Sequence, residues 1–337
     1  MRIAIDAMGG DSAPECNVKG ALMAAKAWKD DDIVLIGDLN RMKPWLSEDL
    51  PNVHLVHASE TIAGDDEPVQ SVRRKKDSSL VVAGRMVRDG EADAMVSAGN
   101  TGALVAMGLF VIGRIKGIER PALAQLLPTM SGGHVLVLDL GAIMDPTPAQ
   151  LLQNAWMGHV YMSKVLGIDN PRIGLLNVGA EPKKGNELVK TAYTLLQEQH
   201  FSFVGNVESR DVLNGVCDVL VCDAFSGNIL LKSFEGALGA ITSHLKEEFT
   251  RSALTKLAAS IIRPGLTRFM KSMDYRQYGG APLFGIDGVC IKSHGSSNAD
   301  AIKHAVSTAR STVMSGMVGR IASEISAVPS LPKQTTL

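Results

Sequence analysis

Four short loops of this chain carry the residue types that bind small anions. Each loop follows an apolar, strand-like run and contains glycine together with serine, asparagine or histidine. In an open parallel sheet the carboxyl ends of the strands line the ligand crevice, and glycine lets backbone N–H groups approach a ligand closely. The loops read AMGGDSAP after Asp6, AGNTG after Ser97, AFSGN after Asp223 and SHGSS after Lys292. The sequence therefore predicts one composite, enzyme-like site for a small anionic ligand.

A cradle for phosphate is predicted from the first loop and from a lysine elsewhere in the chain. Gly9 and Gly10 precede a predicted helix, and a helix N-terminus that follows two glycines can hold a phosphate or an oxyanion. Lys184 stands before Gly185 at the start of another predicted helix. There its ammonium would neutralise phosphate as a point charge.

Side chains that stabilise an oxyanion or move a proton are predicted in the other loops. Asn100 and Asn228 would donate their amides to a carbonyl or phosphate oxygen, although Asn100 would look the same as a helix cap. His294 would transfer protons at a strand end, or else it has a structural role. Asp6 would orient the donors, or tie down the turn that follows the first strand. The remaining candidates for ligand contact are Thr101, Ser226, Gly227 and Ser296.

Composition and motifs argue against several other classes of function. The formal net charge is −1 and aromatic residues make up 4% of the chain, so nucleic acid is not expected as a partner. The sequence contains neither the G-x-G-x-x-G nor the P-loop pattern, which argues against a dehydrogenase on a similar fold. The four cysteines are scattered without a C-x-x-C pair, so no zinc site or disulfide framework is indicated. We expect no cofactor and no metal.

Strand-like and helix-like runs alternate over most of the chain, which predicts an α/β fold. The alternation indicates a mostly parallel sheet with helices on both faces, an α/β/α arrangement. Strands are predicted at 3–6, 33–37, 53–57, 94–97, 135–139, 173–177, 202–204, 219–223 and 289–292, and helices at 14–29, 78–88, 148–166, 186–199 and 297–310. Because no linker or repeat interrupts the chain, residues 1–337 are expected to form a single domain.

The apolar runs are too short to predict a membrane span. The longest extends from Ala103 to Gly113, whereas a spanning helix needs roughly 20 residues. The N-terminus begins with a strand and shows no apolar signal segment. We therefore expect a cytoplasmic protein that associates with a membrane only peripherally.

Residues 227–276 are predicted to form a helical excursion: a long helix and then a basic amphipathic helical pair. Pro264 should divide the pair into two short helices. The polar positions are basic, with no acid between Ser252 and Met273. Such a pair is typical of a membrane-surface element. The alternative is a hairpin that forms a dimer, and different parts of the pair can serve the two roles. The predicted membrane contacts are Leu254, Leu257, Ala258, Ile261, Leu266 and Phe269.

The densest basic cluster is the run Arg73, Arg74, Lys75 and Lys76. Most runs of this kind are solvated helix faces. The alternative is a docking patch for an acidic partner, because local charge steers encounter even when the net charge is close to zero.

As an ordered set, these loops resemble those of the bacterial phosphate acyltransferase (PlsX) family. The matching blocks extend from Arg2 to about Arg310, which is nearly the whole chain. The blocks are IDAMGGD from Ile5, RRKKDSS from Arg73, SAGNTGAL from Ser97, IERPAL from Ile118, KGNEL from Lys184, FSGN from Phe225, YGGAP from Tyr278 and IKSHGSS from Ile291. Each block alone is weak, but the set in this order is specific.

The resemblance implies reversible transfer of a fatty acyl group from acyl carrier protein to inorganic phosphate, forming acyl phosphate for phospholipid synthesis. Phosphate attacks the thioester itself, so no enzyme nucleophile is required. The resemblance also implies a homodimer with a Rossmann-like fold similar to that of isocitrate and isopropylmalate dehydrogenases, without a nicotinamide cofactor. The family is cytoplasmic and can lie on the membrane near the glycerol-phosphate acyltransferase that uses its product.

On this interpretation Lys184, Asn228 and His294 are the catalytic candidates, and the basic run would dock acyl carrier protein. Two alternatives remain open. A phosphotransacetylase-like enzyme acting on acyl-CoA would share the chemistry but would need no docking patch. A non-catalytic scaffold at a membrane surface would explain the amphipathic pair but not four anion-ready loops.

Two stretches depart from the family pattern. The family usually reads Gly-Ala-Asn-Val-Asp where this chain has Ile143 and Met144 at the third and fourth positions, and Pro-Glu-His-Leu where it has Ala149 and Gln150 in the middle. Because the other loops match closely, we expect that the replaced polar side chains are not essential for turnover.

Overall fold

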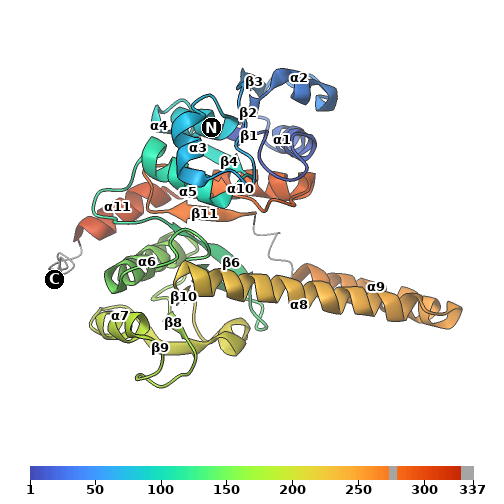
Figure 1. Ribbon diagram of the computed structural model, residues 1–337. Coiled ribbons are helices and arrows are strands. Elements are labelled where there is room, and N and C mark those ends of the chain that lie inside the picture. Colours follow the sequence, from blue (N-terminus) through green and yellow to red (C-terminus); the bar gives the residue numbers. More distant parts are fainter. Residues whose placement is uncertain (273–278, 328–337) are drawn as a thin grey trace.

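The computed structural model describes residues 1–272 and 279–327 and shows an α/β protein built on two sheets. Met273 and Tyr278, which belong to predicted features, lie outside the described residues. Figure 1 shows one sheet in the upper part of the body and the other in the lower part, with two long helices projecting to one side.

The first sheet has seven strands in the order β3-β2-β1-β4-β12-β11-β5. The first five of these run parallel, and β11 is antiparallel to both of its neighbours. The strands are β1 (Arg2–Asp6), β2 (Asp32–Gly37), β3 (Val53–His57), β4 (Ala94–Ser97), β5 (Ala122–Leu123), β11 (Ala281–Phe284) and β12 (Val289–Lys292). The loops after β1, β4 and β12 therefore meet at one edge. The N–H of Asp11 donates to the Gly295 carbonyl at 2.8 Å there, and the N–H of Ser293 to the Ser97 carbonyl at 2.8 Å.

The second sheet has five strands in the order β6-β7-β10-β8-β9. All neighbours are parallel except β6, which is antiparallel to β7. The strands are β6 (Gln125–Pro128), β7 (His134–Leu138), β8 (Ile173–Asn177), β9 (Phe203–Glu208) and β10 (Val219–Val221).

The prediction of mostly parallel pairing is confirmed, but the prediction of one sheet is wrong. The chain passes from the first sheet to the second within seven residues, because Ala124 alone separates β5 from β6. A two-residue strand has no readable periodicity, and no change in composition marks the crossing. The two sheets nevertheless pack together: Leu136 of β7 and Phe284 of β11 belong to one buried apolar cluster.

Helices cover both faces of the first sheet. Ile3 and Ile5 of β1 pack in one apolar cluster with α1 (Glu15–Ala27) and α10 (Ala299–Met314). Ala4, which points the other way along the strand, packs in a second cluster with α4 (Ser79–Arg88) and α5 (Thr101–Met107). Next to α5 lies α3 (Pro68–Arg74), and α2 (Leu39–Met42) follows β2. These clusters make the α/β/α layers that the sequence predicts.

The second sheet is covered on one face by α6 (Pro148–Val160), α7 (Glu187–Gln197) and α11 (Met317–Ala327). Its other face packs against Leu230 and Leu231 in the first turns of α8 (Ala224–Thr250). Short 3₁₀ segments lie at Lys43–Trp45 and Ser209–Asn214, and π-helical turns at Gly108–Ile112 and Tyr161–Val165.

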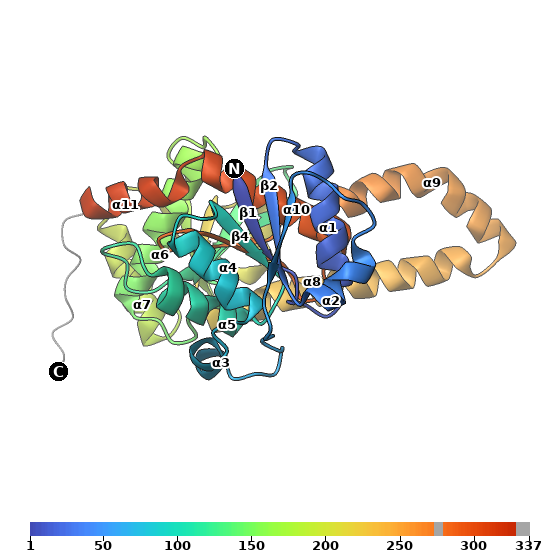
Figure 2. The ribbon, with the colours of Figure 1, turned by 90° about the horizontal axis from the view of Figure 1, so that it is seen from above.

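Beyond its first turns, α8 leaves the body and forms an arm with α9 (Ala253–Ser272), as Figures 1 and 2 show. The predicted break at Pro264 is wrong, because α9 is continuous through this residue. Proline deprives the carbonyl of Ser260 of its helical donor at a cost of about 3 kcal/mol. Both residues are exposed, so water can hydrate that carbonyl. None of the helices that the structure describes is long and apolar enough to cross a membrane.

The apolar residues of α9 divide between two faces. Leu266 and Met270 are half-buried and line a pocket together with Leu245 and Phe249 of α8. The other face is open: the exposed fractions are 77% for Leu254, 62% for Leu257, 74% for Ile261 and 50% for Phe269, and Ala258 is exposed beside them. Leu266 thus lies apart from the remainder of the predicted membrane stripe, because it packs on α8.

Candidate active site

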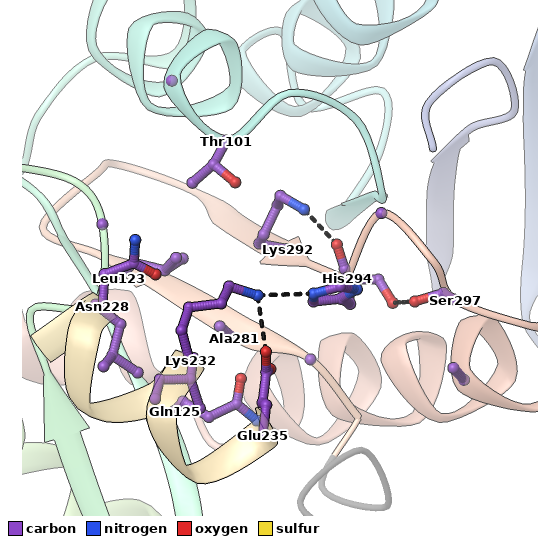
Figure 3. Close-up of a pocket in the computed structure, with 18 of the residues that line it drawn as sticks. Thr101, Leu123, Gln125, Asn228, Lys232, Glu235, Ala281, Lys292, His294 and Ser297 are labelled. Carbon is purple, nitrogen blue, oxygen red and sulfur yellow. Dashed lines mark hydrogen bonds and ion pairs between the residues drawn. The ribbon is translucent and has the colours of Figure 1, made fainter. Parts of the chain in front are cut away.

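A cavity of about 360 Å³ lies between the two sheets, beside the carboxyl end of β12 (Figure 3). The first turn of α5, β11, β12 and the loop after β12 form its wall on the side of the first sheet. The loop after β7 and the early turns of α8 form the opposite wall. Apolar side chains such as Leu123, Leu140 and Met144 alternate with a few polar groups. A concave, largely apolar site with a few convergent polar groups is the usual form of a small-molecule site.

Lys292, the last residue of β12, is the buried cation of this cavity. It is 8% exposed and its ammonium donates to the Ser293 carbonyl. Burial, followed by the nearby charge of Lys232, lowers its pKa to about 8. A buried ammonium is costly unless it meets an anion or another acceptor. Lys292 was not among the sequence candidates, although a lysine that ends a strand of buried residues is the signal for such a site.

This pKa predicts a pH dependence. If the cavity binds the phosphate that the family resemblance implies, the charged Lys292 ammonium should hold it below about pH 8, and the neutral amine should hold it less well above that pH. We therefore expect kcat/KM for phosphate, which reports the free enzyme, to decline as pH rises through about 8. Rates at subsaturating phosphate between about pH 6.5 and 9.5 measure it. Lys292→Arg stays charged over this range and should lose the decline; the same decline in both proteins would assign it to another group.

A polar stripe of α8 faces Lys292 across the cavity. Asn228, Lys232 and Glu235 follow one another at helical spacing on one side of the helix and all line the cavity. The Lys232 ammonium donates to Glu235 Oε2 at 2.8 Å and to His294 Nε2 at 3.0 Å. Lys232 and Glu235 were not predicted; their spacing from the predicted Asn228 could have pointed to them.

His294, one of the predicted catalytic candidates, lines the cavity. The Nδ1 of His294 lies 2.8 Å from the hydroxyl of Ser296, which was predicted as a ligand contact. Partial burial of the imidazole, followed by the charge of Lys232, lowers the pKa of His294. Thr101, at the start of α5, is another predicted residue in the cavity wall.

Asp6, Gly9 and Gly10 instead hold the neighbouring loops together. The Asp6 carboxylate is 2% exposed and accepts the hydroxyls of Ser79 and Ser97 at 2.6 Å each. Burial raises the pKa of this carboxyl. A Cβ at position 9 would lie 2.5 Å from Asp6 Oδ2, and Gly10 has a φ of 104°. These contacts give the residues a packing role, and their contact with a ligand stays a prediction.

Asn100 caps α5, which was the alternative to an oxyanion role. Its Oδ1 accepts from the N–H of Ala103 at 3.1 Å, and its Nδ2 donates to the carbonyls of Gly64 and Asp66. The amide is thus committed to main-chain partners that fix the loop before α5.

Ser226 and Gly227 lie in the first turn of α8, and their predicted ligand contact stays a prediction. The N–H of Ser226 donates to the capping carboxylate of Asp223 at 2.8 Å. A Cβ at residue 227 would lie 2.1 Å from the Asp139 carbonyl oxygen, so glycine is needed for close packing. Asp139 itself is buried and accepts four main-chain N–H groups, among them that of Ile143.

Lys184 and Gly185 lie outside the cavity. Lys184 is exposed on the loop between β8 and α7, where its carbonyl accepts from Asn177 Nδ2 at 3.0 Å. Gly185 has a φ of 91°, and a Cβ there would meet Asn177 Oδ1 at 2.6 Å. The predicted pairing of Lys184 with the Gly9–Gly10 turn is therefore not formed in this chain.

The basic run lies on and after α3, near the cavity wall. Arg73, Arg74 and Lys76 are exposed, and we call these three residues the α3 basic surface. Lys75 is instead paired with Asp66 at 2.5 Å. The Arg73 guanidinium lies 5.1 Å from the centroid of the Phe110 ring, which is 53% exposed. Helix α3 packs on α5, whose first turn lines the cavity.

The two departures from the family pattern have separate structural roles. The N–H of Ile143 donates a hydrogen bond to Asp139 Oδ2, and its carbonyl accepts one from the N–H of Ala224. Met144, beside it, lines the cavity and is 49% exposed. Gln150 forms a capping box with Thr147 at the start of α6. None of these contacts supplies a polar side chain to the cavity.

Comparisons with known proteins agree with this architecture. The model of the family described as "Fatty acid synthesis protein" matches residues 1–320. The chain is 56% identical over 310 residues to a phosphate acyltransferase of Brevibacillus brevis, which covers 92% of each chain. It is 54% identical to a phosphate acyltransferase of Geobacillus thermodenitrificans, over 96% of this chain and 99% of the relative.

Two solved structures share the fold. A phosphotransacetylase from Streptococcus pyogenes superposes with a TM-score of 0.58 at 18% identity, covering 93% of this chain and 94% of the other. A branched-chain phosphotransacylase from Enterococcus faecalis gives a TM-score of 0.57 at 17% identity, covering 93% and 99%. At these identities the likeness concerns the fold alone.

Proposed function

Because the chain belongs to the phosphate acyltransferase family, we propose that it transfers a fatty acyl group reversibly from acyl carrier protein to inorganic phosphate in the cavity between the sheets. The acyl phosphate formed would serve phospholipid synthesis. The observation that carries this proposal is the convergence of Lys292 and Lys232 from opposite walls beside apolar side chains. Two cations suit phosphate, and the apolar wall suits the acyl chain.

The reaction balances without an enzyme nucleophile. An oxygen of hydrogen phosphate attacks the thioester carbonyl carbon, so a C–O bond forms and the C–S bond breaks. The phosphate hydroxyl proton ends on the sulfur, and the Lys232 ammonium is placed to relay it by donating one proton and taking up another. Lys292 holds the phosphate. The Asn228 amide donates to the oxyanion of the tetrahedral intermediate, and a donor of this kind is worth about 3 kcal/mol in the barrier.

The first test is thiol release. Purified protein, acyl-[acyl carrier protein] and inorganic phosphate should together yield free carrier thiol and acyl phosphate. Omitting phosphate should abolish thiol release, because phosphate is the nucleophile. Thiol reagent and hydroxylamine trapping measure the two products. Equal thiol release without phosphate would identify a hydrolase and refute the proposal, and its absence under all conditions would favour the scaffold alternative.

The second candidate is a phosphotransacetylase-like enzyme acting on acyl-CoA, which the shared fold favours. Acyl-CoA brings the same thioester and pantetheine but has no folded acidic surface. Comparing kcat/KM for acyl-CoA and for acyl carrier protein with the same acyl chain separates the two candidates.

We place the docking of acyl carrier protein on the α3 basic surface. Replacing Arg73, Arg74 and Lys76 together with serine should raise KM for acyl carrier protein more than it changes kcat. The effect should shrink as salt rises, because rim charges act on encounter and are screened. Steady-state kinetics at low and high salt measure it. An equal number of exposed lysines beside the second sheet, Lys164, Lys183 and Lys190, changed to serine serve as the matched control. An unchanged KM at low salt would mark the run as a solvated face.

The arm supports a proposal about location. Its open apolar face, with Arg251, Lys256 and Arg263 nearby, suits an anionic membrane surface. We propose a cytoplasmic homodimer that associates peripherally with the membrane through this face, close to the glycerol-phosphate acyltransferase that would consume its product.

A further inference from the structure

Glu235 lines the cavity and contacts Lys232 there. Its side chain is 19% exposed, whereas that of Lys232 is 52% exposed. Lysine has a flexible four-carbon stem, so a cation this exposed needs a partner to keep one direction. Glu235, one helical turn further along α8, supplies that partner at 2.8 Å. The same ammonium reaches His294 Nε2 at 3.0 Å (Figure 3).

The direction of the ammonium decides where His294 carries its proton. An ammonium has donors and no acceptor, so the nitrogen that faces it, Nε2, must be unprotonated. The proton of a neutral ring is then on Nδ1, which lies 2.8 Å from the Ser296 hydroxyl. The main-chain N–H of Ser296 lies 3.2 Å from Nδ1 and would suit the other tautomer. That tautomer would point an N–H at the ammonium, so the Lys232 contact decides against it.

We propose that Glu235 is a positioning residue that holds the Lys232 ammonium against His294 Nε2 and thereby keeps His294 in the neutral Nδ1–H tautomer. This inference rests on the proposed function only for its effect on rate. In that function the neutral imidazole cannot act as the acid that protonates sulfur. His294 instead keeps the Lys232 ammonium in place beside the sulfur.

The charged groups around His294 support this assignment. Burial and the charges of Lys232 and Lys292 lower the pKa of His294, while Glu235 and Asp11 oppose them. An imidazolium at this position would add a third positive charge to the cavity. The arrangement thus separates the roles: Lys232 carries the mobile proton and His294 does not.

The tautomer is tested without substrate. In protein labelled with ¹⁵N-histidine, long-range ¹H–¹⁵N spectra distinguish Nδ1–H from Nε2–H rings, and His294→Gln identifies the signal. Wild type should show the Nδ1–H pattern at pH 8. Glu235→Ala should shift His294 towards the Nε2–H form, and Glu235→Asp should restore part of the wild-type pattern. Glu247→Ala, which removes an exposed carboxylate from the same helix, is the matched control and should change nothing. An Nε2–H ring in wild type, or the same pattern in Glu235→Ala, would overturn the proposal.

The kinetic test uses a double-mutant cycle. Glu235→Ala should lower kcat about tenfold with little change in KM for the acyl donor. Because Glu235 acts through Lys232, the double variant Glu235→Ala/Lys232→Ala should be no slower than Lys232→Ala alone. Additive losses would show that Glu235 acts by another route. If wild type releases no thiol, the proposed function fails while the spectroscopic result still decides the role of Glu235.

Discussion

Lys292→Met should lower kcat/KM for phosphate by at least 100-fold, about 2.7 kcal/mol in the barrier. The substitution removes a buried ammonium from the wall of the cavity, and the loss of charge there is not screened as it would be in water. Methionine fills a similar volume without a charge, so the fold should be retained or slightly stabilised. Initial rates against phosphate concentration measure the loss, and thermal unfolding checks the fold.

Lys184→Ala is the informative comparison for this variant. From sequence alone Lys184 is the phosphate lysine, and its loss should cost at least tenfold in turnover. Its exposed position outside the cavity predicts instead a rate close to wild type. A large loss in Lys184→Ala together with normal turnover in Lys292→Met would refute the assignment of the cavity as the phosphate site.

Leu254→Glu combined with Ile261→Glu should abolish binding to vesicles that contain anionic lipid. The two side chains are 77% and 74% exposed on the open face of α9. Burying each in the interface contributes about 1.5–3 kcal/mol, so losing both should weaken partition by on the order of 100-fold or more. Sedimentation with vesicles measures it, and thiol release in solution should persist because the arm lies away from the cavity.

Size-exclusion chromatography of the same variant separates the membrane from the dimer interpretation. If the open face joins two copies, the new carboxylates are buried at a cost of several kcal/mol and the protein becomes monomeric or insoluble. A dimer that has lost only vesicle binding supports the membrane proposal. A monomer that still binds vesicles contradicts it.

Most strand positions were well predicted from sequence because buried strands such as β4 and β12 leave a strong apolar signal, and β3 was predicted as well although its side chains are half-buried or exposed. The strands at 53–57, 94–97, 173–177 and 289–292 have the predicted bounds. The two-residue β5 and the neighbouring β6 and β11 were missed, and with them the division into two sheets. Antiparallel pairing at the junction depends on contacts between distant segments, such as Leu123 with Leu283, which a local pattern does not contain.

The candidate site shows a similar division. The predicted loops do follow parallel strands, because glycine and asparagine mark the ends of such strands. Several residues that were assigned to ligand contact pack or cap in the structure, and their contact with a ligand stays a prediction. A glycine or an asparagine at such a position can either contact a ligand or serve the fold, and its residue type does not tell which. In the structure a Cβ at Gly227 would lie 2.1 Å from the Asp139 carbonyl oxygen, and the Asn100 side chain caps α5. Lys232 and Glu235 were not among the candidates because helical spacing shows only that they share a face of a helix. It does not show that Lys232 meets His294, which lies 62 residues further along the chain.

Because α8 is one continuous helix, its length sets the distance between the cavity and the end of the arm. The helix carries Glu235 in the cavity wall and reaches Thr250 at the far end of the arm. Fifteen residues at 1.5 Å each separate the two by about 22 Å. The distance between the cavity and the tip of the arm is therefore fixed by this length of helix. Each residue added to or removed from this stretch would change that distance by about 1.5 Å and rotate the tip by about 100° around the helix axis. A change in the length of this segment would therefore change both the reach of the arm and the direction in which its apolar face points.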